Sequence, residues 1–189
     1  MAVPDRLHAD LTILAKLSCA LARARAAPRS PRTLCAPPAG YWRAMSRENV
    51  EVLRRMYAVL TGLQSSQDAF RDGDVDVFLD EFYEDGVVCD GMPGTPIALD
   101  SPVLGREGVK RLMEGQMEVL DYLRVEPEEF VDRGDSVVVP IRLYARARHT
   151  GLEGMQTTVH LWRMRDGKAI QLTVYPTKAD ALEAVGLRE

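Results

Sequence analysis

The stretch TTVHLWRMRDGKAIQLTVY, residues 157–175, carries the clearest structural signal in this chain of 189 residues. Apolar and polar residues alternate on both sides of the pair Asp166 and Gly167, which is the spacing of strands with one buried face. An Asp-Gly pair between such strands suits a type I′ turn, because that turn requires positive φ at both central residues. The pattern therefore predicts an antiparallel hairpin with strands over 157–165 and 168–175.

The residues before this hairpin also alternate, after the hydrophobic period changes near Tyr122. We expect a strand over 123–131, a turn at the Arg-Gly-Asp triplet 133–135 and a long strand over 136–149. One face of the long strand carries arginines and a tyrosine, and the other is apolar. The apolar face consists of Val137, Val139, Ile141, Leu143 and Ala145.

Apolar residues at helical spacing dominate the part of the chain that precedes these strands. They predict a first helix over 47–61 with Ser46 as its N-cap, a second over 75–82 that ends at Asp85-Gly86, and a third that begins near Arg106. A short strand over 87–90 and a Pro- and Gly-rich loop over 91–104 separate the second helix from the third, and a last helix covers 178–185. Helices followed by a meandering sheet predict an α+β domain, with a curved sheet folded over helices around a pocket.

The first 44 residues differ in composition from the rest. They carry seven basic and two acidic residues, whereas the remainder carries 17 basic and 26 acidic residues. Four prolines follow a short apolar run, so we expect a disordered or partly helical basic extension before one domain over 45–189. The apolar run can also be interpreted as a signal peptide, but Asp5, Asp10 and Lys16 argue against that interpretation.

Composition also limits the classes of function. The acidic body argues against a nucleic-acid groove, which needs clustered lysine and arginine. The apolar run over 11–22 is too short to span a membrane. Three unevenly spaced cysteines predict neither a disulfide framework nor a four-ligand zinc site, and no metal or cofactor motif is present in the sequence. We therefore expect a cytoplasmic protein without a metal or cofactor.

Five pieces of the sequence together resemble the nuclear transport factor 2-like superfamily, and within it the SnoaL-like polyketide cyclase group common in bacteria. They are MSRENVE (45–51), FRDGDVD (70–76), GREGV (105–109), VEPEEFVDRGDSVVV (125–139) and HLWRMRDGK (160–168). The resemblance implies an α+β cone over 45–189, with helices packed in the concave face of a strongly curved mixed or antiparallel sheet. It also implies a deep apolar cavity and a homodimer formed through the outer sheet face. An additional segment, 59–67, separates Tyr57 from Gly73 in this chain.

The same resemblance predicts two catalytic residues. Asp90 falls where ketosteroid isomerases, which share the cone fold, place their general-base aspartate, and His160 falls where they place an acid that hydrogen-bonds the developing oxyanion. An apolar cavity raises the pKa of a carboxyl group by destabilising its charged form. The isomerases' first-helix tyrosine aligns with Met56, so Tyr57 or Tyr122 would have to turn inward to act as a second oxyanion donor.

The predicted cavity would be lined by side chains from two helices and three strands. We expect this lining to consist of Tyr57, Met113, Met117, Val139, Ile141, Trp162 and Leu172. Structural interpretations remain open beside the functional ones: Asp90 can form an Asx turn before Gly91, and His160 can be a hydrogen-bonded core residue. Trp162 and the methionines can be ordinary core.

Two functions are compatible with these residues. The first is a cofactor-free isomerase or cyclase that removes a proton next to the carbonyl group of a small apolar ligand. The second is a non-catalytic ligand-binding or dimeric scaffold protein, because this fold does not determine function. The two differ in one structural requirement: the enzyme needs Asp90 and His160 to face one cavity.

Overall fold

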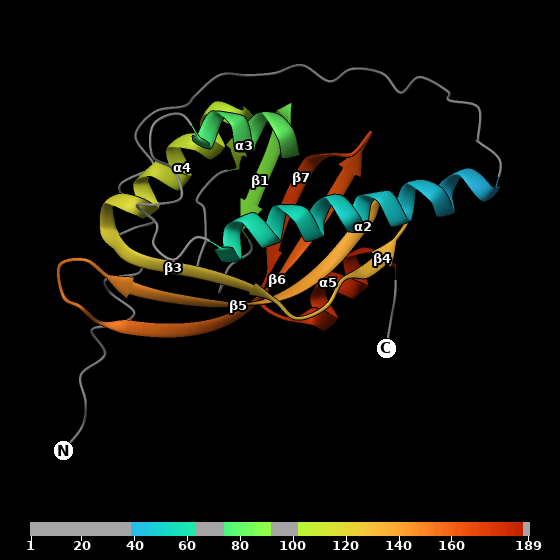
Figure 1. Ribbon diagram of the computed structural model, residues 1–189. Helices are drawn as coiled ribbons and strands as arrows, with labels where there is room; N and C mark the ends of the chain where they lie inside the picture. The colour runs from blue at the N-terminus through green and yellow to red at the C-terminus, as the bar shows by residue number, and fades with distance from the viewer. Residues whose placement is uncertain (1–38, 63–73, 92–101, 187–189) are drawn as a thin grey trace.

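The structure is a computed structural model that describes residues 39–62, 74–91 and 102–186 (Figure 1). Side chains in the first of these ranges are described from Arg47 onward. Some predictions fall on residues outside the described ranges. They concern residues 1–38, most of the additional segment 59–67 and most of the loop 91–104.

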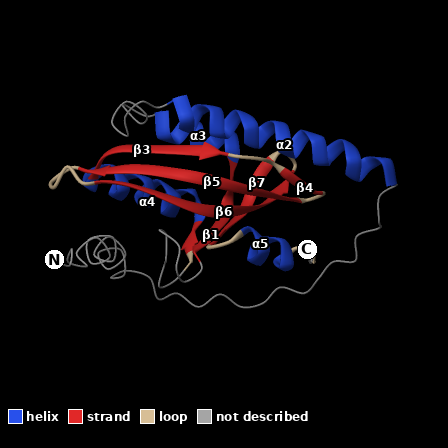
Figure 2. Ribbon diagram, turned by 90° about the horizontal axis from the view of Figure 1, so that it is seen from below, coloured by secondary structure: helices blue, strands red, loops and turns tan. Residues whose placement is uncertain are grey.

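The described strands form a seven-stranded sheet in the order β2-β1-β7-β6-β5-β3, with β4 paired to β5. Strands β1 and β7 run parallel and the other pairs are antiparallel. Figure 2 shows β1 and β7 running at a steep angle to β3 and β5, so the sheet is strongly twisted. The strands are β1 (Tyr83–Gly91), β2 (Val103–Leu104), β3 (Leu120–Pro127), β4 (Val131–Arg133), β5 (Ser136–Ala147), β6 (Glu153–Arg165) and β7 (Lys168–Tyr175).

The turn between β6 and β7 has the predicted geometry. Asp166 has φ of 50° and Gly167 has φ of 73°, so both central residues are in the left-handed region that a type I′ turn requires. The turn at 133–135 is also present, with Gly134 at φ of 80° and its amide donating to the Asp132 carboxylate over 2.9 Å. Local turn chemistry therefore sets the pairing next to both turns, and the register of β6 and β7 shifts once beyond it, between Arg163 and Met164.

Four described helices accompany the sheet: α2 (Ala39–Gly62), α3 (Asp74–Phe82), α4 (Gly105–Val119) and α5 (Lys178–Ala184). The last three lie close to their predicted positions, and Thr177 caps α5 by accepting from the Asp180 amide. The predicted start of the first helix was wrong. Helix α2 begins at Ala39, so Ser46 lies inside it and is not its N-cap.

Two predicted strands also differ from the observed ones. Helix α3 ends at Phe82. The pair Asp85-Gly86, which was predicted to end that helix, lies within β1. Pairing of β1 with β7 is irregular between Tyr83 and Val88. The predicted strand 123–131 is divided into β3 and β4. Between them the Glu128 amide donates to the Pro140 carbonyl over 2.9 Å, so the chain stays attached to β5 through the break.

The sheet separates two hydrophobic clusters. The larger one lies between the concave face and helices α2, α3 and α4, and includes Leu53, Phe82 and Val109. The smaller one lies on the outer face, where Leu161 of β6 and Leu182 of α5 belong to one cluster. Figure 1 accordingly shows α2 and α5 on different sides of β5 and β6.

The central strands are buried on both faces because they lie between these clusters. Residues 136–141 of β5 are all buried, although only alternate residues face the larger cluster. Strand order, the mixed sheet and the helices on its concave face confirm the predicted α+β fold class. None of the described helices is long and apolar enough to cross a membrane.

Candidate functional site

Three side chains form a hydrogen-bonded chain inside the larger cluster. The Trp162 indole Nε1 donates to the Tyr57 hydroxyl over 2.9 Å, and this hydroxyl lies 2.7 Å from Nδ1 of His160. Only 1% of Trp162, 1% of Tyr57 and 8% of His160 are exposed. A polar chain at this depth is the most distinctive chemical feature of the described core. We name it the Trp162–Tyr57–His160 chain.

The sheet register places two members of the chain side by side on the concave face. His160 pairs with Val139 of β5 and Val174 of β7, and Trp162 lies two residues further along β6 on the same face. Tyr57 approaches from α2, where Leu53 and Met56 of the same helix are fully buried against the sheet. The tyrosine hydroxyl is therefore positioned by helix packing and the histidine by strand pairing.

Aromatic contacts hold Tyr57 and Trp162 from several directions. The ring of Tyr57 meets Phe130 edge-on at a centroid distance of 5.8 Å, and Trp162 meets Tyr83 edge-on at 5.9 Å. The rings of Tyr57 and Trp162 are 6.4 Å apart with an interplanar angle of 82°. Edge-to-face contacts of this kind restrict ring orientation, so the hydroxyl and the indole NH have little freedom to move apart.

The electrostatic environment keeps these groups neutral near pH 7. Burial lowers the pKa of His160 to about 4, because the imidazolium form loses its hydration. Burial also raises the pKa of Tyr57 well above its usual value, with a smaller opposing effect from the Trp162 hydrogen bond. The second imidazole nitrogen, His160 Nε2, is buried and has no hydrogen-bond partner among the described residues. Such a group is uncommon in native cores.

Asp90 does not join this site. It pairs with Thr173 of β7, and Thr173 pairs with Leu161 of β6, which belongs to the outer cluster. Paired residues on neighbouring strands point to the same face, so Asp90 faces outward and is half-buried. Its neighbour Cys89 pairs with the concave-face residue Leu172 instead. The prediction that Asp90 and His160 face one cavity was wrong, because β1 presents Cys89 to the concave side.

Comparisons with known proteins agree with this architecture. A family model described as SnoaL-like domain matches residues 63–172. The chain belongs to the SnoaL-like family. The comparison with curated protein sequences found no match.

Solved structures show the same fold for this SnoaL-like protein. TerC, co-crystallised with polyporic acid, is 27% identical, with 74% of this chain and 99% of TerC covered at a TM-score of 0.53. A putative SnoaL-like polyketide cyclase from Jannaschia sp. CCS1 is 21% identical, with 76% and 94% covered and a TM-score of 0.55. An NTF2-like protein of unknown function from Burkholderia pseudomallei is 20% identical, with 74% and 98% covered and a TM-score of 0.53.

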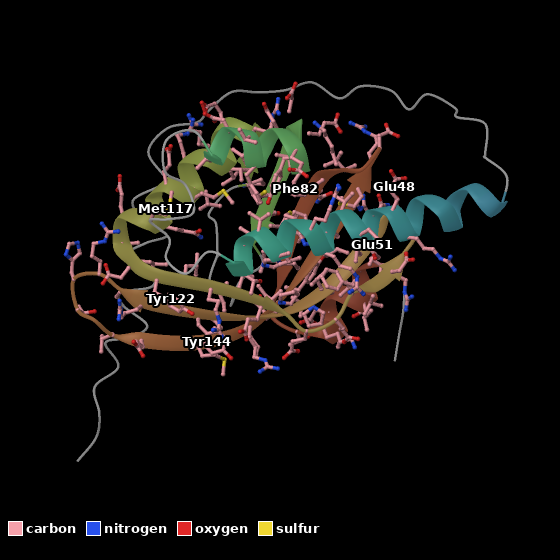
Figure 3. All side chains as sticks on the ribbon, in the orientation of Figure 1. Glu48, Glu51, Phe82, Met117, Tyr122 and Tyr144 are labelled. Atoms are coloured by element: carbon pink, nitrogen blue, oxygen red, sulfur yellow. The ribbon has the colours of Figure 1, made fainter. Side chains whose placement is uncertain are left out.

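The structure brings most of the predicted lining residues together. Tyr57, Val139, Ile141, Trp162 and Leu172 belong to the larger cluster, and Met113 packs against it. Met117, labelled on α4 in Figure 3, is half-buried near the end of that helix. These positions agree with the face predicted from alternation and helical spacing. Whether they contact a ligand stays a prediction.

A pocket of about 400 Å³ lies elsewhere, on the outer face of the sheet. Its walls include Tyr122, Arg124, Tyr144, Glu153 and Met155 from β3, β5 and β6. Figure 3 shows Tyr144 on the side of the sheet away from α2. Tyr122 therefore faces outward and is not the additional oxyanion donor considered from the sequence. The cavity predicted beside His160 is a separate feature and stays a prediction.

Within the described residues, no group of three or more His, Cys, Asp or Glu side chains is arranged to hold a metal ion. Cys89 is buried, and burial raises the pKa of its thiol to about 12. Because the thiolate is the form that reacts and binds metals, Cys89 is an inert core residue in the native protein.

Sequence reasoning missed the chain itself. It treated Tyr57 and Trp162 as cavity lining and His160 as a separate donor. The hydrogen bond between Tyr57 and His160 was not predicted, because the two residues are 103 positions apart in the sequence. The available signal was the polar atom on each of these side chains at a position with core periodicity. Buried tyrosine and tryptophan usually find hydrogen-bond partners, so their pairing could have been sought among the other inward polar groups.

Proposed function

We propose that this SnoaL-like protein binds a small apolar carbonyl compound beside His160, without a cofactor. The observation that carries the proposal is the buried Nε2 atom of His160, which has no hydrogen-bond partner among the described residues. Leaving such a group unpaired costs about 1–3 kcal/mol. A ligand with one polar atom and an apolar body would satisfy Nε2 and otherwise contact the aliphatic and aromatic side chains of the larger cluster.

A related protein supports an organic ligand for this fold. TerC, which matches 74% of this chain at 27% identity, was co-crystallised with polyporic acid. The resemblance does not transfer that compound to this chain, but it makes polyporic acid a reasonable first probe. The residues around His160 are the part of this chain to which we assign the binding role.

The isomerase or cyclase activity is the second candidate. A neutral imidazole N–H in a dry environment can stabilise the oxygen of an enolate, which favours this chemistry. Proton abstraction also needs a base on the concave side. Among the described residues, no carboxylate is buried, and Asp90 lies on the outer face. Binding through His160 is therefore the primary proposal, and turnover is measured in the same samples.

A thermal-shift panel tests the binding proposal. Cyclic ketones, polyketide-like phenols and polyporic acid are added to the wild type, because a ligand that binds only the native state raises its melting temperature. His160→Asn keeps a side-chain amide close to the Nδ1 position, where it can still accept from Tyr57, and removes the distal nitrogen. We expect at least one compound to stabilise the wild type and to bind His160→Asn about tenfold more weakly.

Asp90→Asn is the control, because it introduces the same residue, asparagine, on the other face of the sheet. It should bind the panel as the wild type does. A panel without any stabilising compound, or equal affinity in wild type and His160→Asn, would contradict the proposed function. Turnover of a ketone that survives in Asp90→Asn and is lost in His160→Asn would favour the enzymatic candidate.

We also propose a homodimer formed through the outer sheet face. Met155 is 58% exposed beside Tyr144 on this face, and the Arg124 guanidinium lies over the Tyr144 ring at 5.0 Å. Such a surface combines apolar, aromatic and arginine side chains, which are enriched at protein interfaces. Light scattering should find a dimer for the wild type and a monomer for Met155→Glu. A monomeric wild type at micromolar concentration would exclude this assembly.

A further inference from the structure

We infer that Trp162 and Tyr57 fix the tautomer of His160, so that Nε2 carries the hydrogen and the site accepts ligands with a hydrogen-bond acceptor and disfavours ligands that can only donate. This inference rests on the proposed function for its ligand but not for the tautomer, which is a property of the protein alone. Trp162 and Tyr57 are positioning residues in this scheme, since they act on a ligand through His160.

Trp162 determines the direction of hydrogen-bond donation along the Trp162–Tyr57–His160 chain. An indole Nε1 can only donate, so the 2.9 Å contact with Tyr57 must be a hydrogen bond into the tyrosine oxygen. The Tyr57 hydroxyl then has one hydrogen of its own to donate. His160 Nδ1 lies 2.7 Å from it and accepts this hydrogen if its lone pair is free.

The two neutral tautomers of His160 leave different numbers of unpaired groups. With the hydrogen on Nε2, the Tyr57 hydroxyl donates to Nδ1, and only the Nε2–H group lacks a partner among the described residues. With the hydrogen on Nδ1, the imidazole would donate to the Tyr57 oxygen. The hydroxyl hydrogen of Tyr57 and the lone pair on Nε2 would then both lack a hydrogen-bond partner. Each unpaired buried polar group is destabilising, so the first arrangement is favoured.

Protonation on both nitrogens does not offer a third arrangement near neutral pH. The imidazole is surrounded by Val139, Val174 and the rings of Tyr57 and Trp162, none of which carries a negative charge. Burial accordingly lowers the pKa of His160 to about 4. The site therefore presents a neutral N–H donor, and its complement is an uncharged acceptor such as a ketone oxygen.

Nuclear magnetic resonance of the ligand-free protein tests the tautomer directly. Histidine is labelled with ¹⁵N, and the His160 signals are assigned by their loss in His160→Asn. The protonated and unprotonated ring nitrogens have well-separated ¹⁵N shifts, so the experiment reports which one carries the hydrogen. We expect a protonated Nε2 and an unprotonated Nδ1 at pH 7. A protonated Nδ1 would overturn the inference, whether or not the protein binds ligands.

A pair of probes of similar size tests the consequence for specificity. The two probes are 2-indanone and indole. The carbonyl oxygen of 2-indanone can only accept a hydrogen bond, whereas the N–H group of indole can donate one. Affinities of both are measured by calorimetry and expressed as a ratio, and the ratio in His160→Asn serves as the baseline. We expect the wild type to favour 2-indanone by about tenfold over that baseline.

Tyr57→Phe separates positioning from simple packing. It removes the hydroxyl that holds Nδ1 as an acceptor, so both tautomers should appear in the ¹⁵N spectrum and the preference for 2-indanone should fall towards the baseline. Tyr83→Phe is the matched control, because Tyr83 is 4% exposed and also contacts the Trp162 ring, yet no hydrogen bond joins it to His160 in the described residues. It should keep the wild-type tautomer and preference. A wild type that prefers indole, or a Tyr57→Phe variant that keeps the full preference, would refute the role of the chain.

Discussion

Acidification should destabilise this protein through His160, and the size of the effect follows from its burial. The pKa of His160 is lowered to about 4 in the folded protein, whereas the unfolded chain has the ordinary value of about 6.5. The unfolded state therefore binds a proton more readily than the native state between these two values. Stability is retained above about pH 6.5 and is lost as pH falls towards about 4.

The magnitude can be worked from the two pKa values. The difference between these two pKa values corresponds to about 3 kcal/mol in full, of which about 2 kcal/mol is lost between about pH 7 and about pH 4.5. Tyr57 and Tyr83 have raised pKa values and Cys89 has a pKa of about 12, so none of these neighbours changes charge in this interval. His160 is therefore the titrating group of this part of the core.

Urea unfolding followed by tryptophan fluorescence measures the effect at several pH values. All other ionisable groups are common to the wild type and His160→Asn. The difference between the two proteins isolates His160. We expect the wild type to lose about 2 kcal/mol more than the variant between about pH 7 and about pH 4.5. Parallel stability curves for the two proteins would refute the conclusion that His160 is held neutral by burial.

Three further predictions follow from the described core and turns. Leu182→Ala should lower the free energy of unfolding by about 2–5 kcal/mol in urea titrations, because Leu182 is 5% exposed in the outer cluster; an unchanged midpoint would show that α5 does not contribute to the stability of the sheet. Gly167→Ala should cost about 1 kcal/mol in the same assay, because Gly167 has φ of 73°. Cys89 should resist iodoacetamide near pH 8 in the native protein and react in urea, as read by peptide mass spectrometry, because burial raises its pKa to about 12; alkylation without urea would contradict its burial.

Much of the fold was predictable because the relevant signals are local. The alternation and Asp-Gly pair of residues 157–175 predicted the β6–β7 hairpin, and the apolar stripe ending at Phe82 predicted α3. The start of α2 was not predictable from its first strong N-cap residue. Serine is compatible with a helix interior. The capping preference of Ser46 therefore did not stop the helix from extending upstream to Ala39.

The candidate site was only partly predictable. His160 and Trp162 share a face because residues two apart on a strand always do, and alternation alone could assign that face to the core. The sequence VVCD at 87–90 has apolar residues in both registers, so it could not decide whether Cys89 or Asp90 faces inward. Pairing with β7, more than 80 residues away, decided it, because Cys89 pairs with Leu172 of the larger cluster and Asp90 pairs with Thr173.

The amino-acid order by itself determined the α+β class, the positions of most helices and strands, the two hairpin turns and the apolar face of β5, because each depends on neighbours a few residues apart. Tertiary structure alone decided that Asp90 lies outside and that Trp162, Tyr57 and His160 form one chain. Strand register and helix docking fix which distant polar atoms meet, and these are set by packing across the whole sheet. The chemistry of this protein therefore rests on contacts that no local pattern specifies.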